Sequence, residues 1–314
     1  MKKLAIVAAL AATLLTLTAC AGAPASTSGS TESSSASPTS GTEGNASFDS
    51  SKIQIVASTN IWGSVALSVG GDLVQVTSII DTASQDPHSY EASARDQLAF
   101  KQADLVITNG GGYDEFAAKL AESATEAEKI AIADVATNID AKKNEHLWYS
   151  VSAVGQATYA IADQLGKVDS ANTETYLANA DKFIEGLTGI AAGYGEIQKK
   201  AKGKKFFATE PVANLMLSDL GFVDATPAEF SKAIENETDV PPLALKNALD
   251  LIGSGKINVV VLNAQTENTQ TKQIADKAKS AGVAVVTLSE LMPKGMAYID
   301  WMGENLIALD KALG

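Results

Sequence analysis

Residues 171–202 read ANTETYLANADKFIEGLTGIAAGYGEIQKKAK, and their pattern indicates how the rest of the chain is arranged. Apolar side chains recur along it at spacings of three and four residues, which places one stripe on a single helix: Tyr176, Ala180, Phe183, Leu187, Ile190, Tyr194 and Ile197. At a rise of about 1.5 Å per residue, the helix would be roughly 45 Å long, enough to pass along two lobes. A coiled-coil dimer helix is the alternative interpretation, although its heptad pattern lasts only about three repeats.

Short apolar runs alternate with helical patterns on both sides of this stretch, as is typical of parallel sheets covered by helices. The expected strands are 53–57, 74–80, 104–108, 130–133, 205–208, 257–262 and 283–288, and the expected helices include 92–102, 113–123, 151–165, 241–253 and 269–281. The sequence therefore predicts an α/β protein with two lobes, each a mainly parallel sheet flanked by helices, joined by one long helix. The expected boundaries are 51–168 for the first lobe, 169–203 for the linking helix and 204–314 for the second lobe.

The first 50 residues predict export and attachment to a membrane. Residues 1–19 have the charged, apolar and small-residue parts of a signal peptide, and the apolar part is too short to span a bilayer. The sequence LTAC at 17–20 fits a bacterial lipobox, which predicts cleavage before Cys20, acylation of that cysteine and a location on the extracytoplasmic face of the cell membrane. An ordinary secretory signal with an accidental cysteine is the alternative. The Ala-, Ser-, Thr- and Gly-rich remainder of 20–50 buries little apolar surface and is expected to be a disordered tether.

Composition excludes several classes of site. Cys20 is the only cysteine, so the folded part contains no internal disulfide and no thiolate metal centre. Without Lys2 and Lys3, the chain holds 22 basic and 37 acidic residues, a formal charge of −15. This balance argues against nucleic acid as a partner.

Four side chains are candidates for a polar site. His88 and His146 are the only histidines, and both fall in predicted loops beside acidic and aromatic residues. Glu210 follows an expected strand by two residues and is expected at a helix start, whereas Glu290 follows another strand by two. Three of the four, all except His146, thus lie beyond the carboxyl ends of strands, where open α/β sheets bind ligands. Each is also compatible with a plain structural or surface role.

Five ordered motifs make the chain resemble the metal-binding lipoproteins of ABC transporters that import manganese or zinc. They are DPHSYE at 86–91, ADLVITNGGGYD at 103–114, EHLW at 145–148, ATEPV at 208–212 and YIDWM at 298–302, and the resemblance covers 53–312. It implies a metal ion bound between the two lobes by His88 and His146 from the first lobe and by Glu210 and Glu290 from the second. The alignment of Glu290 leaves a neighbouring residue open as the fourth ligand.

The resemblance leaves the metal open between Zn²⁺ and Mn²⁺. Glu210 stands where many zinc-type members carry histidine, as in manganese-type members, but two imidazoles and two carboxylates also bind zinc well. Imidazole ligands need a second group to orient the ring. The candidates for such supporting roles are Asn60, Asp86, Glu145, Asn263 and Gln265.

The expected function is that of a monomeric, lipid-anchored solute-binding protein that delivers a divalent metal ion to an ABC transporter permease and is not an enzyme. A metal-dependent hydrolase and a metal-stapled surface adhesin are the alternatives. Because metal competes with protons for imidazole, the sequence also predicts that affinity falls below about pH 6.

Overall fold

The computed structural model describes residues 49–82 and 85–314. The expected signal peptide, the lipidation site Cys20 and nearly all of the expected tether lie outside the described residues. The described residues form one compact unit. None of the helices in the described ranges combines the length and apolar character needed to cross a bilayer.

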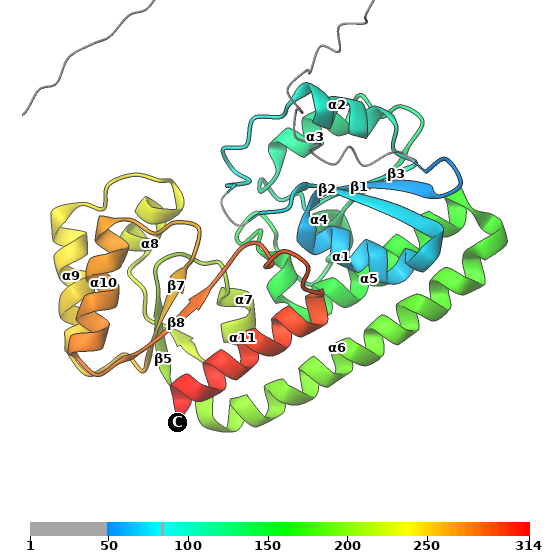
Figure 1. The fold of residues 1–314 in the computed structure, drawn as a ribbon. Helices are drawn as coiled ribbons and strands as arrows, with labels where there is room; N and C mark the ends of the chain where they lie inside the picture. The colour runs from blue at the N-terminus through cyan, green and yellow to red at the C-terminus, as the bar shows by residue number, and fades with distance from the viewer. Residues whose placement is uncertain (1–48, 83–84) are drawn as a thin grey trace, which may run out of the picture. The chain divides into compact units, whose positions relative to one another are not determined.

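The first sheet has four parallel strands in the order β2-β1-β3-β4 (Figure 1). The strands are β1 (Ile53–Thr59), β2 (Val74–Ile80), β3 (Leu105–Thr108) and β4 (Glu128–Ala131). The helices that accompany them are α1 (Asn60–Gly70), α2 (Ala94–Lys101), α3 (Glu115–Ala121), α4 (Ile132–Val135) and α5 (Val151–Val168). The two central strands, β1 and β3, are almost entirely buried, as expected when helices cover both faces of a parallel sheet.

The second sheet repeats this arrangement with four parallel strands in the order β6-β5-β7-β8. The strands are β5 (Lys205–Ala208), β6 (Val223–Asp224), β7 (Val259–Asn263) and β8 (Ala284–Leu288). The helices are α7 (Asn214–Asp219), α8 (Ala228–Glu235), α9 (Pro242–Gly253), α10 (Thr269–Ser280) and α11 (Tyr298–Leu313). Both sheets therefore have the same strand order. In each sheet the second strand lies on one side of the first strand and the third strand lies on the other side, so the chain changes its direction across the sheet between the first and third strands. Ligands of open α/β sheets bind near this switch point.

The long helix expected at 171–202 is confirmed as α6 (Thr173–Ala201). All seven residues of its predicted apolar stripe are buried, and the helix packs against α1, α5 and α11. Because elements of the same chain cover the stripe, it does not form the exposed seam that a coiled-coil dimer requires.

Two local expectations were wrong, and one strand was missed. Strand β6 was missed because it is only two residues long and exposed, so it leaves no apolar run to detect. The strand expected at 130–133 is shifted to Glu128–Ala131, and Ile132 begins α4 instead. Glu210 does not lie at a helix start, since α7 begins at Asn214. The residue before a proline avoids the helical region, and Pro211 imposes this on Glu210.

The last helix ties the two halves of the fold together. At the start of α11, the Tyr298 hydroxyl donates to the carbonyl oxygen of Trp148 at 2.5 Å, and the Tyr298 N–H donates to Ser64 Oγ at 3.1 Å. Trp148, like Trp62 of α1, is completely buried in the core.

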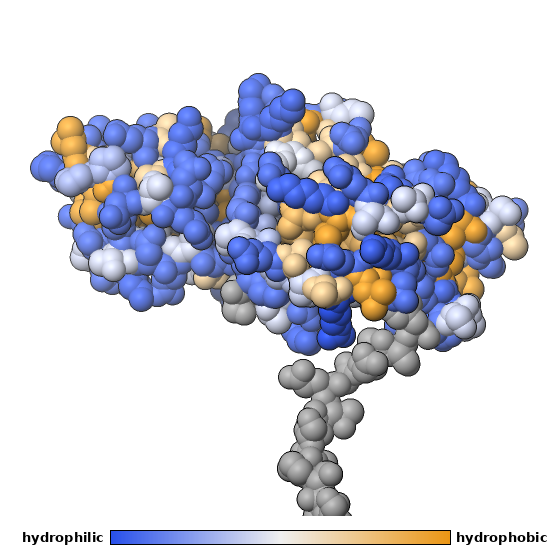
Figure 2. All heavy atoms as spheres, turned by 90° about the horizontal axis from the view of Figure 1, so that it is seen from above, coloured by the Kyte–Doolittle hydropathy of each residue, from blue (hydrophilic) through white to orange (hydrophobic). Residues whose placement is uncertain are grey.

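On the face shown in Figure 2, hydrophilic residues cover most of the surface.

Candidate functional site

The loop that carries His88 follows β2 and is held by the side chain of Asp86. Asp86 Oδ1 accepts from the His88 N–H at 3.0 Å, and Oδ2 accepts from Ser89 Oγ at 2.6 Å. Asp86 thus fixes the backbone of His88 and leaves the imidazole ring to other contacts. The ring stands edge-on to Tyr113, with 5.1 Å between centroids, and remains partly exposed.

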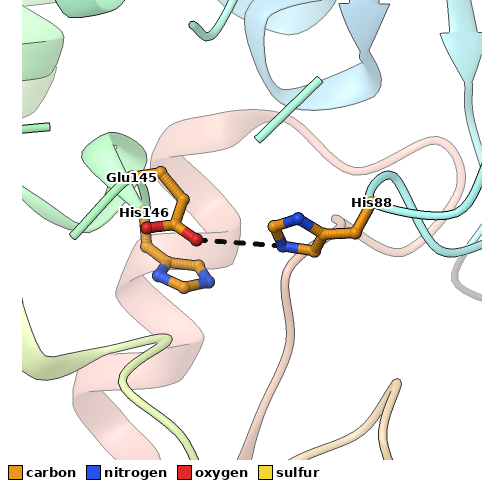
Figure 3. Close-up of side chains that lie close together, drawn as sticks. All are labelled: His88, Glu145 and His146. Atoms are coloured by element: carbon orange, nitrogen blue, oxygen red, sulfur yellow. Dashed lines mark ion pairs between the residues drawn. The ribbon is translucent and has the colours of Figure 1, made fainter. Parts of the chain in front are cut away.

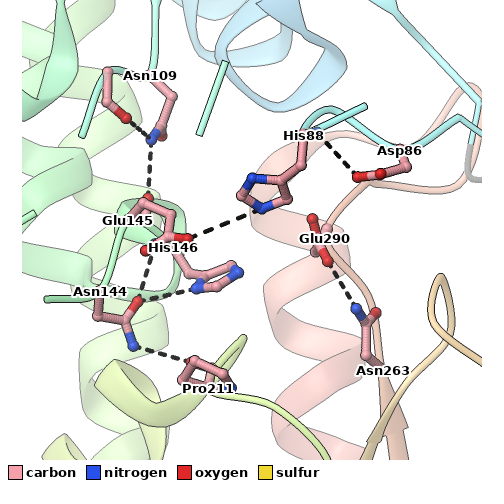
Figure 4. Close-up of polar contacts among 10 residues, drawn as sticks. Asp86, His88, Asn109, Asn144, Glu145, His146, Pro211, Asn263 and Glu290 are labelled. Atoms are coloured by element: carbon pink, nitrogen blue, oxygen red, sulfur yellow. Dashed lines mark hydrogen bonds and ion pairs between the residues drawn. The ribbon is translucent and has the colours of Figure 1, made fainter. Parts of the chain in front are cut away.

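His146 is buried, and its ring orientation is fixed by Asn144 (Figure 4). Asn144 Oδ1 accepts from the backbone N–H of His146 at 3.0 Å and lies 3.1 Å from His146 Nδ1. Because that oxygen can only accept, the neutral ring carries its proton on Nδ1, and the lone pair is on Nε2. Burial, and then the nearby His88, lower the pKa of His146 to about 3. The imidazole of His146 is therefore neutral at pH values well below 6.

Two buried carboxylates come from the second sheet. Glu210, after β5, accepts a hydrogen bond from Thr266 Oγ1. Glu290, after β8, accepts from Asn263 Nδ2 at 2.7 Å through Oε1, and its N–H donates to Gln265 Oε1 at 2.9 Å. Burial and the charge of Glu290 raise the pKa of Glu210 to about 8. Burial also raises the pKa of Glu290.

One cavity of about 730 Å³ brings together groups from both sheets. Three of the four predicted ligands line it: His88, Glu210 and Glu290. His146 lies against this region, since it forms one group with His88 and Glu145 in which the possible ligand atoms all lie within 4.8 Å of one another (Figure 3). Further acidic residues line the cavity, together with lysines: Asp86, Glu145, Glu235, Lys142, Lys143 and Lys232.

The residues expected in supporting roles divide into three kinds. Asn263 and Gln265 hold Glu290, and Asp86 holds the His88 loop. The Glu145 carboxylate lies closer to the two imidazoles than a supporting role requires, because its possible ligand atom belongs to one three-residue group with those of His88 and His146. Asn60 does not contact a histidine ring, since its amide exchanges hydrogen bonds with the backbone of Met292 at 2.8 and 3.3 Å. Asn60 thereby links α1 to the loop that follows β8.

Two asparagines of the site were not identified from the sequence. Asn144 binds His146 and also donates through Nδ2 to the carbonyl oxygen of Pro211 at 3.0 Å. Asn109, at the end of β3, donates to the carbonyl oxygen of Glu145 at 2.9 Å and accepts from Trp62 Nε1 at 3.0 Å. The strand-end rule that selected Glu210 would have selected Asn109. Asn144 has only its position two residues before His146 as a signal.

If His146 binds zinc, as the resemblance implies, replacement of Asn144 by alanine should weaken zinc binding about 10- to 100-fold, because outer partners that orient a ligating histidine have effects of this size. The imidazole would lose the acceptor that fixes its tautomer. Competition titration with a zinc chelator measures the change. Asn138→Ala is the matched control, since the Asn138 amide contacts only the exposed Ser152 Oγ in the described structure. Equal affinities for the two variants would contradict the orienting role.

Comparison with known proteins shows similarity to proteins named for metal uptake. The model of the family described as zinc-uptake complex component A, periplasmic (ZnuA), matches residues 55–312. The metal ABC transporter substrate-binding lipoprotein SsaB of Streptococcus sanguinis is 23% identical over 291 residues, which cover 86% of this chain and 92% of that protein. The manganese ABC transporter substrate-binding lipoprotein scaA of Streptococcus gordonii is 24% identical over 291 residues, covering 84% and 90%.

Solved structures share the fold. The binding protein FpvC from Pseudomonas aeruginosa, in complex with Mn²⁺, superposes with a TM-score of 0.69 at 22% identity, over 83% of this chain and 98% of that one. A family model that spans both sheets and the helix between them covers all the elements that carry the cavity. The chain belongs to the ZnuA family of periplasmic zinc-uptake components.

Proposed function

We propose that this protein captures one divalent metal ion in the cavity between its two sheets and delivers it to an ABC importer. The supporting observation is the pair of buried carboxylates, Glu210 and Glu290, that face the imidazole group without a basic partner. Among the described residues, no lysine or arginine forms a salt bridge with either carboxylate. A buried carboxylate must be protonated or paired, and a bound cation supplies the pairing.

The proposed ligands are His88, His146, Glu210 and Glu290. Nitrogen donors and carboxylate oxygens suit both Zn²⁺ and Mn²⁺, and intrinsic affinity favours zinc. The comparisons point to both metals, since the family is named for zinc uptake and the relative from S. gordonii is named for manganese. We therefore propose a site that accepts either ion, with the carboxylates moving the balance toward manganese.

The proposed location follows from the N-terminal sequence. Acylation at Cys20 would hold a monomer on the extracytoplasmic face of the cell membrane, close to a permease. Relatives named as substrate-binding lipoproteins of metal ABC transporters support this assignment. Release of the ion requires that docking on the permease favour a form of the protein with weaker metal affinity. The family is named for zinc uptake, which favours neither the hydrolase nor the adhesin alternative; a laminin-binding adhesin of Streptococcus agalactiae shares the fold at 21% identity, which carries the fold alone.

Direct metal binding tests the proposal. Residues 47–314, which form one compact unit, should bind close to one equivalent of Zn²⁺ or Mn²⁺ reversibly after treatment with a chelator. The protein should remain folded without metal and should show no hydrolysis of ester or phosphoester substrates. Absence of stoichiometric binding would exclude the transport role. Turnover of a substrate would favour the hydrolase alternative. Unfolding on metal removal would favour the adhesin alternative, in which the metal ion stabilises the fold.

A further inference from the structure

The backbone of Glu145 is held by two hydrogen bonds, and its side chain lines the part of the cavity that the first lobe forms. Its carbonyl oxygen accepts from Asn109 Nδ2 at 2.9 Å and from the Leu147 N–H at 2.7 Å. Its side chain is 16% exposed and lines the cavity with His88. The neighbouring residue in the chain, His146, is oriented by Asn144. The backbone therefore presents a carboxylate and an imidazole from adjacent positions to the same region.

The spacing of these groups fits atoms that bind one metal ion, and at this distance His88 and Glu145 also form an ion pair when the imidazole is protonated. His88 Nε2 lies 3.9 Å from Glu145 Oε1, which is beyond hydrogen-bond distance. Two donor atoms that each bind one ion at about 2.0–2.2 Å are separated by roughly 3–4 Å when they are adjacent in the coordination sphere. His146 joins the same group, in which all possible ligand atoms lie within 4.8 Å of one another.

A second observation indicates that a cation belongs between these groups. Glu290, which is 3% exposed, has one carboxylate oxygen, Oε1, bound to Asn263, whereas its other oxygen, Oε2, is buried and makes no hydrogen bond of ordinary geometry, although the buried Tyr113 hydroxyl interacts with this carboxylate. Figure 4 shows the Glu290 carboxylate directed toward the space beside His88. An unpaired buried carboxylate oxygen is unfavourable unless a ligand completes it.

We propose that Glu145 is a fifth metal ligand and a determinant of metal selectivity. This inference rests on the proposed function and adds a third carboxylate to the two imidazoles and two glutamates. The first lobe then presents three donors, His88, Glu145 and His146, that receive the ion before Glu210 and Glu290 complete its coordination. Five protein donors with three carboxylates fit the higher coordination numbers and oxygen preference of Mn²⁺ better than the tetrahedral preference of Zn²⁺.

Cobalt spectroscopy tests coordination directly. Co²⁺ in a four-coordinate site absorbs visible light several-fold more strongly than in a five- or six-coordinate site. Bound to residues 47–314, Co²⁺ should give a weak spectrum, and Glu145→Gln should strengthen the absorption because one ligand is lost. Glu145→Asp should retain an intermediate spectrum, since it keeps a carboxylate on a shorter side chain.

Glu229→Gln is the matched control. Glu229 is exposed on α8 and does not line the cavity, so this variant removes a carboxylate away from the site and should leave the spectrum unchanged. Manganese and zinc competition gives the second measurement: Glu145→Gln should weaken manganese binding at least about tenfold more than zinc binding.

The outcomes separate this inference from the function on which it rests. Cobalt bound by Glu145→Gln with the unaltered spectrum, and with an unaltered manganese-to-zinc ratio, would overturn the role of Glu145 while leaving the transport proposal intact. Failure of the unsubstituted protein to bind zinc, manganese or cobalt would overturn both. Melting temperatures of the metal-free variants show whether each remains folded.

Discussion

The metal-free protein should lose about 2 kcal/mol of stability as the pH rises from 6.5 to 8. In the folded state the pKa of Glu210 is raised from 4.5 to about 8, mainly by burial, so the folded protein holds a proton that the unfolded chain releases. Stability therefore falls with rising pH across the interval between these two values. The raised pKa of Glu290 acts in the same direction. Urea unfolding at several pH values measures the change.

His146 has the opposite effect, but only at lower pH. Its folded pKa of about 3 lies below the ordinary value of 6.5, so the unfolded chain binds the extra proton, and this contribution to stability is lost as the pH falls from 6.5. The interval above pH 6.5 therefore isolates the carboxylates.

Glu210→Gln should flatten the decrease, because glutamine keeps an acceptor for Thr266 and carries no titrating proton. Glu229→Gln, on the exposed side of α8, is the control and should retain the decrease. Saturating zinc should stabilise the protein more at pH 8 than at pH 6.5, because at the lower pH the ion must displace a proton. Stability that is equal at both pH values for the unsubstituted protein would contradict the burial argument.

Replacement of His146 by leucine should lower zinc affinity by about 100- to 1000-fold. Structural zinc sites with four ligands have apparent binding free energies of about 10–16 kcal/mol, or roughly 3 kcal/mol per ligand. Leucine fills the space of the buried ring but offers no donor atom. Calorimetry or chelator competition measures the affinity. His88→Ala should cause a loss of similar order, although His88 is more exposed.

Thr158→Val controls for disturbance of a buried polar group. Thr158 lies fully buried in α5, and its hydroxyl donates to the carbonyl oxygen of Val154, away from the cavity residues. This variant should lose some stability and retain the affinity for zinc. If His146→Leu remained folded and bound zinc as tightly as the Thr158→Val protein, His146 could not be a ligand.

The same strand order in both sheets explains how loops from distant parts of the chain reach one cavity. The His88 loop follows β2, whereas Glu210 and Glu290 follow β5 and β8, so each carries its polar group at the carboxyl end of a strand. The links between Asn144 and Pro211, and between Asn60 and Met292, show that the two halves of the fold are in contact.

The α/β class, the long helix and most of the strands could be predicted from local patterns in the sequence. Helix α6 could be predicted closely because its apolar residues follow a local repeat, and all members of the repeat are buried. Strand β6 could not, since two exposed residues carry no pattern. The strand-end rule and the five motifs also selected the His88, Glu210 and Glu290 positions that line the cavity.

The interactions among these groups could not be predicted, because they depend on how distant segments pack. The sequence placed Glu145 beside a histidine, but the packing of the loop on Asn109 brings its carboxylate close to both imidazoles. The contact between Asn144 and the His146 ring, and the opposite pKa shifts of His146 and Glu210, also could not be predicted from the sequence. Periodicity is a property of neighbouring residues and can be read locally. Burial and the distances between loops depend on the packing of the whole chain, so they arise only when it is folded.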